Sequence, residues 1–326
     1  MTQGTIVAMT SLANAPKAPI TPMDWRPVST HRCALGESPF WHPHEQTLYW
    51  VDIAQRQVAR ANIYMGTIQT WDLPSEPGCI APVLGGGLVL ALRDGIFRAA
   101  EWGGALARIA QLPYDPNSVR ANDGRCDALG RFWIGTVDEA KSHNAAGLYC
   151  VDARQGAVKV SCHAEGALTA NGLEWSPDRR TLYWSDTPRH LTYAWDYSEP
   201  EPRLSNRRVF QSFETKPANW SFPDPGYQGR PDGAAVDLLG NYYVAMYEGA
   251  RVCKFAPDGR LLAAIPTPVA CPTMPCFGGE DGRTLFLTSA SKGRSDQELT
   301  ALPLSGAILQ TRVAVGGASV HFFVQG

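Results

Sequence analysis

Short hydrophobic runs alternate along the whole chain with turns rich in Gly, Pro and Asp. Five of these runs belong to one recurring phrase, a polar turn followed by an aromatic-rich stretch. The five copies are residues 42–52, 127–135, 176–186, 237–245 and 279–288. Runs of β-branched and aromatic residues bounded by turn residues predict strands, and no long stretch has the helical period. The pattern therefore predicts an all-β protein built from repeats.

The spacing of the repeats predicts their number. The aromatic markers of the five phrases lie 83, 51, 59 and 43 residues apart, at Trp50, Trp133, Trp184, Tyr243 and Phe286. The gap of 83 has room for one degenerate copy, which residues 85–94 fit. Residues 252–262 predict a hairpin with a Pro-Asp-Gly turn. Six such units predict a six-bladed β-propeller with four-stranded blades around a central channel.

The repeats extend from Glu37 to Phe286, which favours one domain even in a chain of 326 residues. We therefore expect a single propeller domain over residues 23–326. Residues 1–22 are rich in Ala, Thr and Pro and predict a loose N-terminal tail. The ring is expected to close by pairing a C-terminal strand, either 306–315 or 318–325, with an N-terminal strand near 28–34.

Composition narrows the class of protein. Apolar residues make up 44% and charged residues 18% of the chain, as in soluble globular proteins. A net charge of −2 without a basic stripe argues against nucleic-acid binding. No apolar run is long enough for a membrane span, and the N-terminus lacks the pattern of a secretory signal. We therefore expect a cytoplasmic protein whose eight cysteines, none in a C-x-x-C pair, are reduced.

Four oxygen-bearing side chains share one position in the repeat. Counted back from the first large residue of each phrase, they lie 10 or 11 residues earlier, and they are Glu37, Asn122, Asn171 and Asp232. Equivalent positions on successive blades form a ring around the channel, so these side chains are expected to converge at one mouth. Two carboxylates and two amide oxygens suit Ca²⁺, Mg²⁺ or Mn²⁺, and Zn²⁺ or Fe²⁺ remain open.

The alternative is that these residues only make turns. Asn-Asp-Gly, Asn-Gly and Pro-Asp-Gly are common turn sequences. The shared register favours a site instead. The two remaining blades offer Cys79 and Met274 at nearby positions, so the ring is polar on four blades of six. A ring specialised in this way is more typical of a site than of a structural need common to all repeats.

Arg120 stands two residues before Asn122, and side chains at i and i+2 of an extended segment point the same way. We therefore expect Arg120 at the channel mouth, where it would contact substrate. A surface arginine paired with Asp123 or Asp127 is the alternative. The seven histidines do not fall in the shared register, and no serine-nucleophile motif or phosphate-binding loop is present.

Several of these motifs resemble those of a known family. They are Leu-Gly-Glu-Ser-Pro (35–39), Arg-x-Asn-Asp-Gly (120–124), Ala-Asn-Gly-Leu-x-Trp-Ser-Pro-Asp (170–178), Pro-Asp-Gly-Ala-Ala-Val-Asp (231–237) and Pro-Thr-x-Pro-x-Phe-Gly-Gly (272–279). The chain resembles the gluconolactonase, senescence-marker and luciferin-regenerating enzyme family. The resemblance implies a six-bladed propeller with one divalent cation. It also implies that Glu37, Asn171 and Asp232 are metal ligands, that Arg120 and Asn122 bind substrate, and that Asp232 is the general base.

Two features depart from the family pattern. The family often places a substrate-binding acid shortly after the Gly-Thr of the third blade, and here either Asp138 or Glu139 could serve. The segment 211–230 is longer than usual and rich in aromatic residues. It leads into the stretch that holds Asp232, so we expect it at the same mouth as a lid or pocket wall. An ordinary surface excursion is the alternative.

The function expected from this reading is metal-dependent hydrolysis of a cyclic ester, above all a sugar aldonolactone, with a small lactone as the partner molecule. One alternative is a cation-binding regulatory propeller without turnover. A second is a scaffold for protein partners, and a third is an enzyme that hydrolyses other esters. The sequence does not indicate the oligomeric state.

Overall fold

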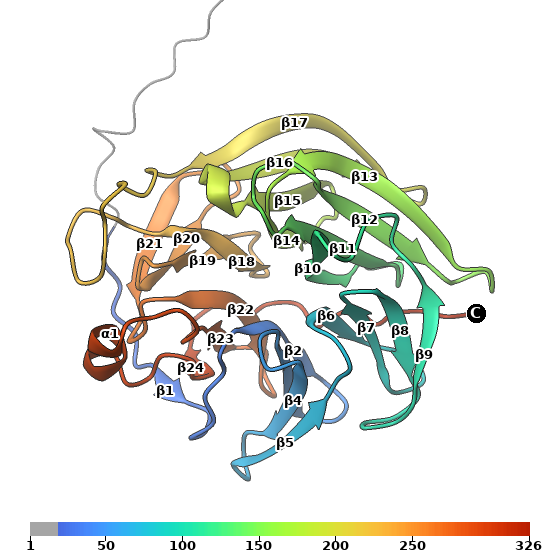
Figure 1. Ribbon diagram of the computed structural model, residues 1–326, viewed down its shortest axis with the longest axis horizontal. Coiled ribbons are helices and arrows are strands. Elements are labelled where there is room, and N and C mark those ends of the chain that lie inside the picture. The colour runs from blue at the N-terminus through green and yellow to red at the C-terminus, as the bar shows by residue number, and fades with distance from the viewer. Residues whose placement is uncertain (1–18) are drawn as a thin grey trace, which may run out of the picture.

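Six antiparallel sheets of four strands are arranged radially around a common centre in the computed structural model, which describes residues 19–326 (Figure 1). The predicted six-bladed propeller is confirmed. Residues 1–18 lie outside the described residues, so the tail and the domain boundary at residue 23 stay predictions. Just before that boundary, Ile20 pairs with Ala264 of the fifth blade.

Each of the first five blades is made of four consecutive strands. Blade 1 contains β2 (Gly36–His42), β3 (Thr47–Asp52), β4 (Gln57–Asn62) and β5 (Thr67–Asp72), and blade 2 contains β6 (Pro77–Pro82), β7 (Leu88–Leu92), β8 (Gly95–Ala99) and β9 (Leu106–Ala110). Blade 3 contains β10 (Val119–Cys126), β11 (Phe132–Asp138), β12 (Ala146–Asp152) and β13 (Lys159–Ala167). Blade 4 contains β14 (Ala170–Trp175), β15 (Thr181–Asp186), β16 (Leu191–Ser198) and β17 (Arg203–Ser212), and blade 5 contains β18 (Arg230–Val236), β19 (Tyr242–Tyr247), β20 (Arg251–Phe255) and β21 (Leu261–Pro266).

The sixth blade joins the two ends of the described chain. Its strands, in spatial order from the centre, are β22 (Pro272–Gly278), β23 (Thr284–Ser289), β24 (Leu309–Arg312) and β1 (Arg26–Pro27). The C-terminal strand falls within the first of the two ranges expected, 306–315. The N-terminal strand is Arg26–Pro27 and not 28–34, although the Val28 N–H still donates to the Ile308 carbonyl at 2.8 Å. Residues 318–325 form only isolated bridges.

The recurring phrase of the sequence contains the second strand of each blade. These strands are buried almost throughout, whereas an outer strand such as β5 is largely exposed. Both faces of a second strand are covered by neighbouring blades, so its sequence is a continuous apolar run and not an alternating one. The aromatic side chains fill the wedges between blades: Trp133 packs edge-on against Trp175 at 5.7 Å, and Trp41 stacks on Phe286 at 5.7 Å.

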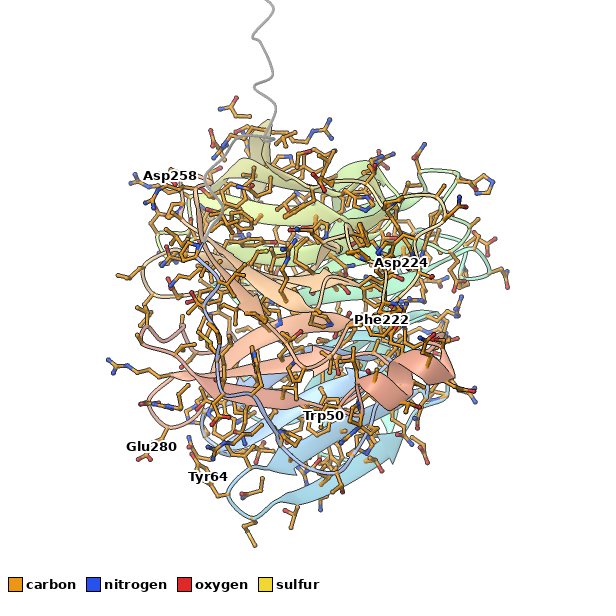
Figure 2. All side chains as sticks on the ribbon, turned by 90° about the vertical axis from the view of Figure 1, so that its left-hand side faces the viewer. Trp50, Tyr64, Phe222, Asp224, Asp258 and Glu280 are labelled. Atoms are coloured by element: carbon orange, nitrogen blue, oxygen red, sulfur yellow. The ribbon has the colours of Figure 1, made fainter. Side chains whose placement is uncertain are left out.

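The two faces of the propeller differ (Figure 2). One face carries the short helix α1 (Asp296–Ala301) together with the segment that holds Phe222 and Asp224. The turns that hold Asp258 and Glu280 lie on the opposite face. The last stretch of the chain contacts blade 2, where Phe323 bridges to Val83. None of the helices in residues 19–326 has the length and apolar character needed to cross a membrane.

Candidate functional site

The four side chains with a shared register lie on the innermost strands of four blades. Glu37 is in β2, Asn122 in β10, Asn171 in β14 and Asp232 in β18. The sequence pattern suggested that each of these residues precedes a strand. The structure places them within the strands. All four line one cavity of about 430 Å³, which falls within the size range of small-molecule sites, about 300–1,000 Å³. The predicted convergence is therefore present in the structure.

A β-bulge follows each of these positions. The register of the inner strand shifts between Glu37 and Phe40 of the first blade and between Asn171 and Glu174 of the fourth. The same shift brackets Asn122 in β10 and Asp232 in β18. A bulge leaves a residue unpaired and changes the direction of its side chain. The bulges therefore interrupt the ladder where the four polar side chains face the centre.

The backbone conformation of Gly172 explains why the Asn-Gly motif could also be interpreted as a turn. Its φ is +61°, and a Cβ at this position would lie 2.4 Å from the Tyr242 hydroxyl of the next blade. The position therefore needs glycine both for its left-handed backbone and for the close approach of β19. The motif is a bulged inner strand and not a turn between elements.

Two carboxylates in this cavity have raised pKa values. Burial raises the pKa of Glu37 well above its usual range, and the nearby Asp232 and Asp123 carboxylates raise it further. Burial also raises the pKa of Asp232; Arg230 opposes that shift, and Asp123 adds to it. Like charges in a desolvated site disfavour each other, so both acids would be stabilised as anions by a cation between them.

Asp123 is a buried carboxylate that the sequence reading did not assign to the site. Its Oδ2 accepts a hydrogen bond from the Leu173 N–H at 2.9 Å. Its Oδ1 is buried without a hydrogen-bond partner among residues 19–326. The signal was present, because Asp123 is the middle residue of the Asn-Asp-Gly motif, but spacing alone pointed to its neighbour.

The two amides are held in one hydrogen-bonded chain. Asn122 Nδ2 donates to Asn171 Oδ1 at 2.7 Å, and Asn171 Nδ2 donates to the Thr187 hydroxyl at 2.8 Å. Thr187 in turn donates to the Pro231 carbonyl, immediately before Asp232, at 2.7 Å. Blades 3, 4 and 5 are thereby connected at the cavity floor, which fixes the orientation of both amides.

Arg120, which we expected at the channel mouth, donates to Asn122 Oδ1 at 3.0 Å but is not among the residues that line the cavity. The alternative partners Asp123 and Asp127 do not form ion pairs with it in the described chain. Its guanidinium Nε lies 3.8 Å from Glu139, which also binds Arg93 through both carboxylate oxygens at 2.8 and 2.9 Å.

This arrangement distinguishes the two acids that follow the Gly-Thr of the third blade. Asp138 accepts backbone hydrogen bonds from Ser142 and His143 and stabilises its own loop. Glu139 is the acid beside Arg120, so it is placed to orient that side chain.

Three further basic side chains line the cavity, and none of them falls in the shared register. They are Lys141, His190 and Arg230. Lys141 belongs to the loop after β11, and Arg230 begins β18. His190 Nε2 lies 2.9 Å from the Tyr227 hydroxyl. A loop, the end of a short 3-10 helix and the start of a strand contribute these groups individually, so the repeat could not reveal them.

Most of the segment 211–230, which we expected to act as a lid, lies between β17 and β18 as residues 213–229. Phe222 packs in one apolar cluster with Leu35 and Tyr247, both of which line the cavity. Tyr227 reaches the cavity through His190. The segment therefore lies at the same mouth as the four polar side chains, as expected, and its influence on substrate choice stays a prediction.

The fit of this site to a metal rests on its oxygen donors. No three His, Cys, Asp or Glu side chains of residues 19–326 come together as a ligand group. The donor set consists instead of the Glu37 and Asp232 carboxylates with the Asn171 and Asn122 amides. Carboxylate and amide oxygens are ligands for hard divalent cations. Burial raises the pKa of both acids, so their anionic forms need a counter-charge in this cavity. The residues present fit a divalent cation.

The fold and the site together define a six-bladed propeller with a charged, oxygen-rich small-molecule cavity at one end of its centre. Residues 35–291 match the model of the SMP-30/gluconolactonase/LRE-like family. The chain belongs to this family.

Its relatives cover nearly its whole length. A 6-deoxy-6-sulfogluconolactonase from Pseudomonas putida is 40% identical over 289 residues, 89% of this chain and 94% of the relative. Regucalcin from Gallus gallus is 31% identical over 306 residues, 91% of this chain and 97% of the relative. The structure is similar to that of regucalcin from Agrobacterium tumefaciens, described as a calcium-binding protein, with a TM-score of 0.83 and 25% identity over 94% of this chain and 99% of that one.

Proposed function

We propose that the chain is a metal-dependent lactonase that hydrolyses a sugar aldonolactone. The observation that carries this proposal is the convergence of Glu37, Asn122, Asn171 and Asp232 on one cavity. Membership of a family that includes the P. putida lactonase supports it.

Glu37, Asn171 and Asp232 would hold one divalent cation, with Ca²⁺, Mg²⁺, Mn²⁺, Zn²⁺ and Fe²⁺ as the candidates. Such a cation, when bound, supplies Lewis-acid polarisation of the lactone carbonyl.

The protein's own groups would carry the proton and position the substrate. The Asp232 carboxylate accepts a proton from the attacking water and returns it to the ring oxygen as the ester C–O bond breaks, which yields the hydroxy acid. Arg120 and Asn122 bind substrate hydroxyls. Glu139, through its contact with Arg120, would hold the guanidinium beside Asn122.

A panel of lactones, assayed after chelation and re-addition of individual divalent ions, tests the proposal. The panel should include gluconolactone. It should also include the sulfonate-bearing analogue, because the P. putida relative is a 6-deoxy-6-sulfogluconolactonase. We expect ring opening, followed as acid release, to stop on chelation and return with at least one ion. An ion that binds without ring opening of any lactone would favour a regulatory cation-binding protein, the description given to the A. tumefaciens structure.

A further inference from the structure

Two positively charged side chains line the candidate site beside its two carboxylates. Lys141 and Arg230 line the same cavity as Glu37 and Asp232. Lys141 forms no ion pair with any residue of the described chain. Burial and, next, the positive charge of Arg230 lower the pKa of Lys141, and Asp232 and Glu248 partly oppose this shift.

The ion pair of Arg230 does not neutralise this edge of the cavity. Arg230 donates to Glu248 at 2.5 Å, but the same carboxylate also accepts from Lys216 at 2.9 Å and from Arg294 at 2.8 Å. Arg294 has a second carboxylate partner, Glu298. Three cations therefore share two carboxylates, and Lys141 adds a fourth positive charge that has no ion-pair partner in the described chain.

A bound metal ion increases this excess. In the proposed function the negative charges of Glu37 and Asp232 serve as ligands of a divalent cation, so they do not compensate Lys141 and Arg230. Positive side chains beside a divalent cation are unfavourable unless an anion joins them. The Arg230 guanidinium is also held over the Tyr247 ring at 4.8 Å, which fixes its direction at the cavity edge.

We infer that Lys141 and Arg230 form a subsite for a tetrahedral anionic group, a sulfonate or a phosphate, carried by the lactone at the end of the molecule away from its carbonyl. The inference rests on the proposed function and specifies its substrate class. Arg230 precedes Asp232 by two residues in β18, which separates their Cα atoms by roughly 6–7 Å in an extended strand. This separation matches a six-carbon lactone with its carbonyl at the metal ligands and its exocyclic carbon at the subsite. Arginine and lysine are the side chains suited to such oxyanions.

The test compares three substrates that differ only at C6. They are glucono-δ-lactone, which is neutral, and its analogues with a sulfonate or a phosphate at C6. For the wild-type protein we expect kcat/KM to be at least about tenfold higher for an anionic lactone, and rising ionic strength should lower only the anionic values. The two anionic substrates distinguish sulfonate from phosphate.

Substitution of the lysine tests the residue itself. Lys141→Gln should lose about tenfold in kcat/KM with the preferred anionic lactone and less than twofold with the neutral one. Lys141→Arg should restore most of the loss. Lys159→Gln is the matched control, because Lys159 is exposed on β13 of the same blade and does not line the cavity. Equal losses with charged and neutral substrates, or a wild-type preference for the neutral lactone, would overturn the inference.

A binding measurement separates this inference from the proposed function. Calorimetry on chelated protein compares gluconate with gluconate that carries a sulfonate or a phosphate at C6. We expect a ligand with the additional anionic group at C6 to bind about tenfold more tightly to the wild type than gluconate does, and this advantage to disappear in Lys141→Gln. Absence of turnover together with this binding difference would refute the lactonase and keep the subsite. Turnover without any charge preference would refute the subsite and keep the lactonase.

Discussion

At the scale of single residues, Asp232 has the most demanding place in the site. It is buried, it lies beside Glu37 and Asp123, and it is expected both to hold a cation and to carry a proton. Asp232→Asn preserves the size of the side chain but removes the proton acceptor. We expect kcat to fall about 100-fold or more with saturating metal, measured as acid release, while the circular dichroism spectrum stays unchanged.

Asp258→Asn is the control for this substitution, because Asp258 lies on the opposite face of the propeller (Figure 2). It should keep full activity. Near-normal turnover in Asp232→Asn would remove Asp232 from the mechanism.

Glu248 is the residue whose charge matters most for stability near the site. It is buried among three cations; burial by itself would raise its pKa, but Arg230, Lys216 and Arg294 hold the pKa below the usual range. A lowered folded-state pKa stabilises the protein above the unfolded value, about 4.3, and this contribution is lost as the pH falls through the folded value. Glu248→Gln should therefore cost about 3 kcal/mol of unfolding free energy at pH 7.

Urea unfolding of both proteins over a series of pH values measures this cost. The difference should shrink as the pH falls below the ordinary range of glutamate. Glu214→Gln, a change at an exposed position of the segment 213–229, should have little effect at any pH. A difference that stays constant with pH would contradict the electrostatic account.

The four polar residues Glu37, Asn122, Asn171 and Asp232 could be identified from the sequence because they occupy the same position in successive repeats. Glu37 and Asn171 could be compared by counting, and the structure places both in one cavity. Lys141 lies in a loop and Arg230 at the start of a strand, and neither has an equivalent in the other repeats. No periodicity in the sequence therefore marks them. Their proximity depends on how blades 3 and 5 face each other, which a local pattern does not contain.

At the scale of elements, the bulged inner strands position the ligands. The sequence suggested that the polar side chains precede their strands, because Asn-Gly and Asp-Gly are also turn motifs. The structure keeps these residues inside β14 and β18 and shifts the register beside them. A bulge is a property of two paired strands, so a single strand's sequence could not reveal it.

The segment 213–229 is the element with the clearest predicted effect on specificity. Phe222 and Tyr227 connect it to residues that line the cavity. Replacing 213–229 by a short Gly-Ser linker should change the ratio of kcat/KM between two lactones about tenfold, because one wall of the pocket is lost. The metal-induced rise in melting temperature should persist, since Glu37, Asn171 and Asp232 are outside the segment.

Replacement of residues 63–66, a turn that includes the exposed Tyr64, with the same type of linker provides the comparison. It should leave the ratio unchanged. An unchanged ratio after loss of 213–229 would show that the segment is an ordinary surface excursion.

At the scale of the whole molecule, the number of blades could be predicted from the sequence, whereas the strands that close the ring were predicted only approximately. We call the pairing of β1 with β24 the seam of the ring. Each blade repeats the same packing of aromatic residues, and this repetition is visible as spacing. The closing strand β1 has only two residues, Arg26 and Pro27. It is too short to have a hydrophobic period, and so is the six-residue helix α1.

The seam should be important for the stability of the whole ring. Leu309 is completely buried in β24, the strand to which β1 pairs. Leu309→Ala should lower the unfolding free energy by about 2–5 kcal/mol, measured by urea unfolding with tryptophan fluorescence. Stabilisation by a divalent ion should weaken as well, since Glu37 lies in the blade next to the seam.

Val209→Ala, at an exposed position of β17, is the reference and should change stability by less than about 0.5 kcal/mol. If Leu309→Ala were no more harmful than this change, the seam would not limit the stability of the ring.

The pairing of β1 with β24 also sets an order of events during synthesis. Arg26 and Pro27 leave the ribosome early, but their partners Gln310 and Leu309 are made much later. Until then the nascent chain is an open series of blades with unpaired edges at both ends. Closure of the ring through β1 therefore follows the synthesis of residues 309 and 310, and a chain that stalls before residue 309 lacks this pairing.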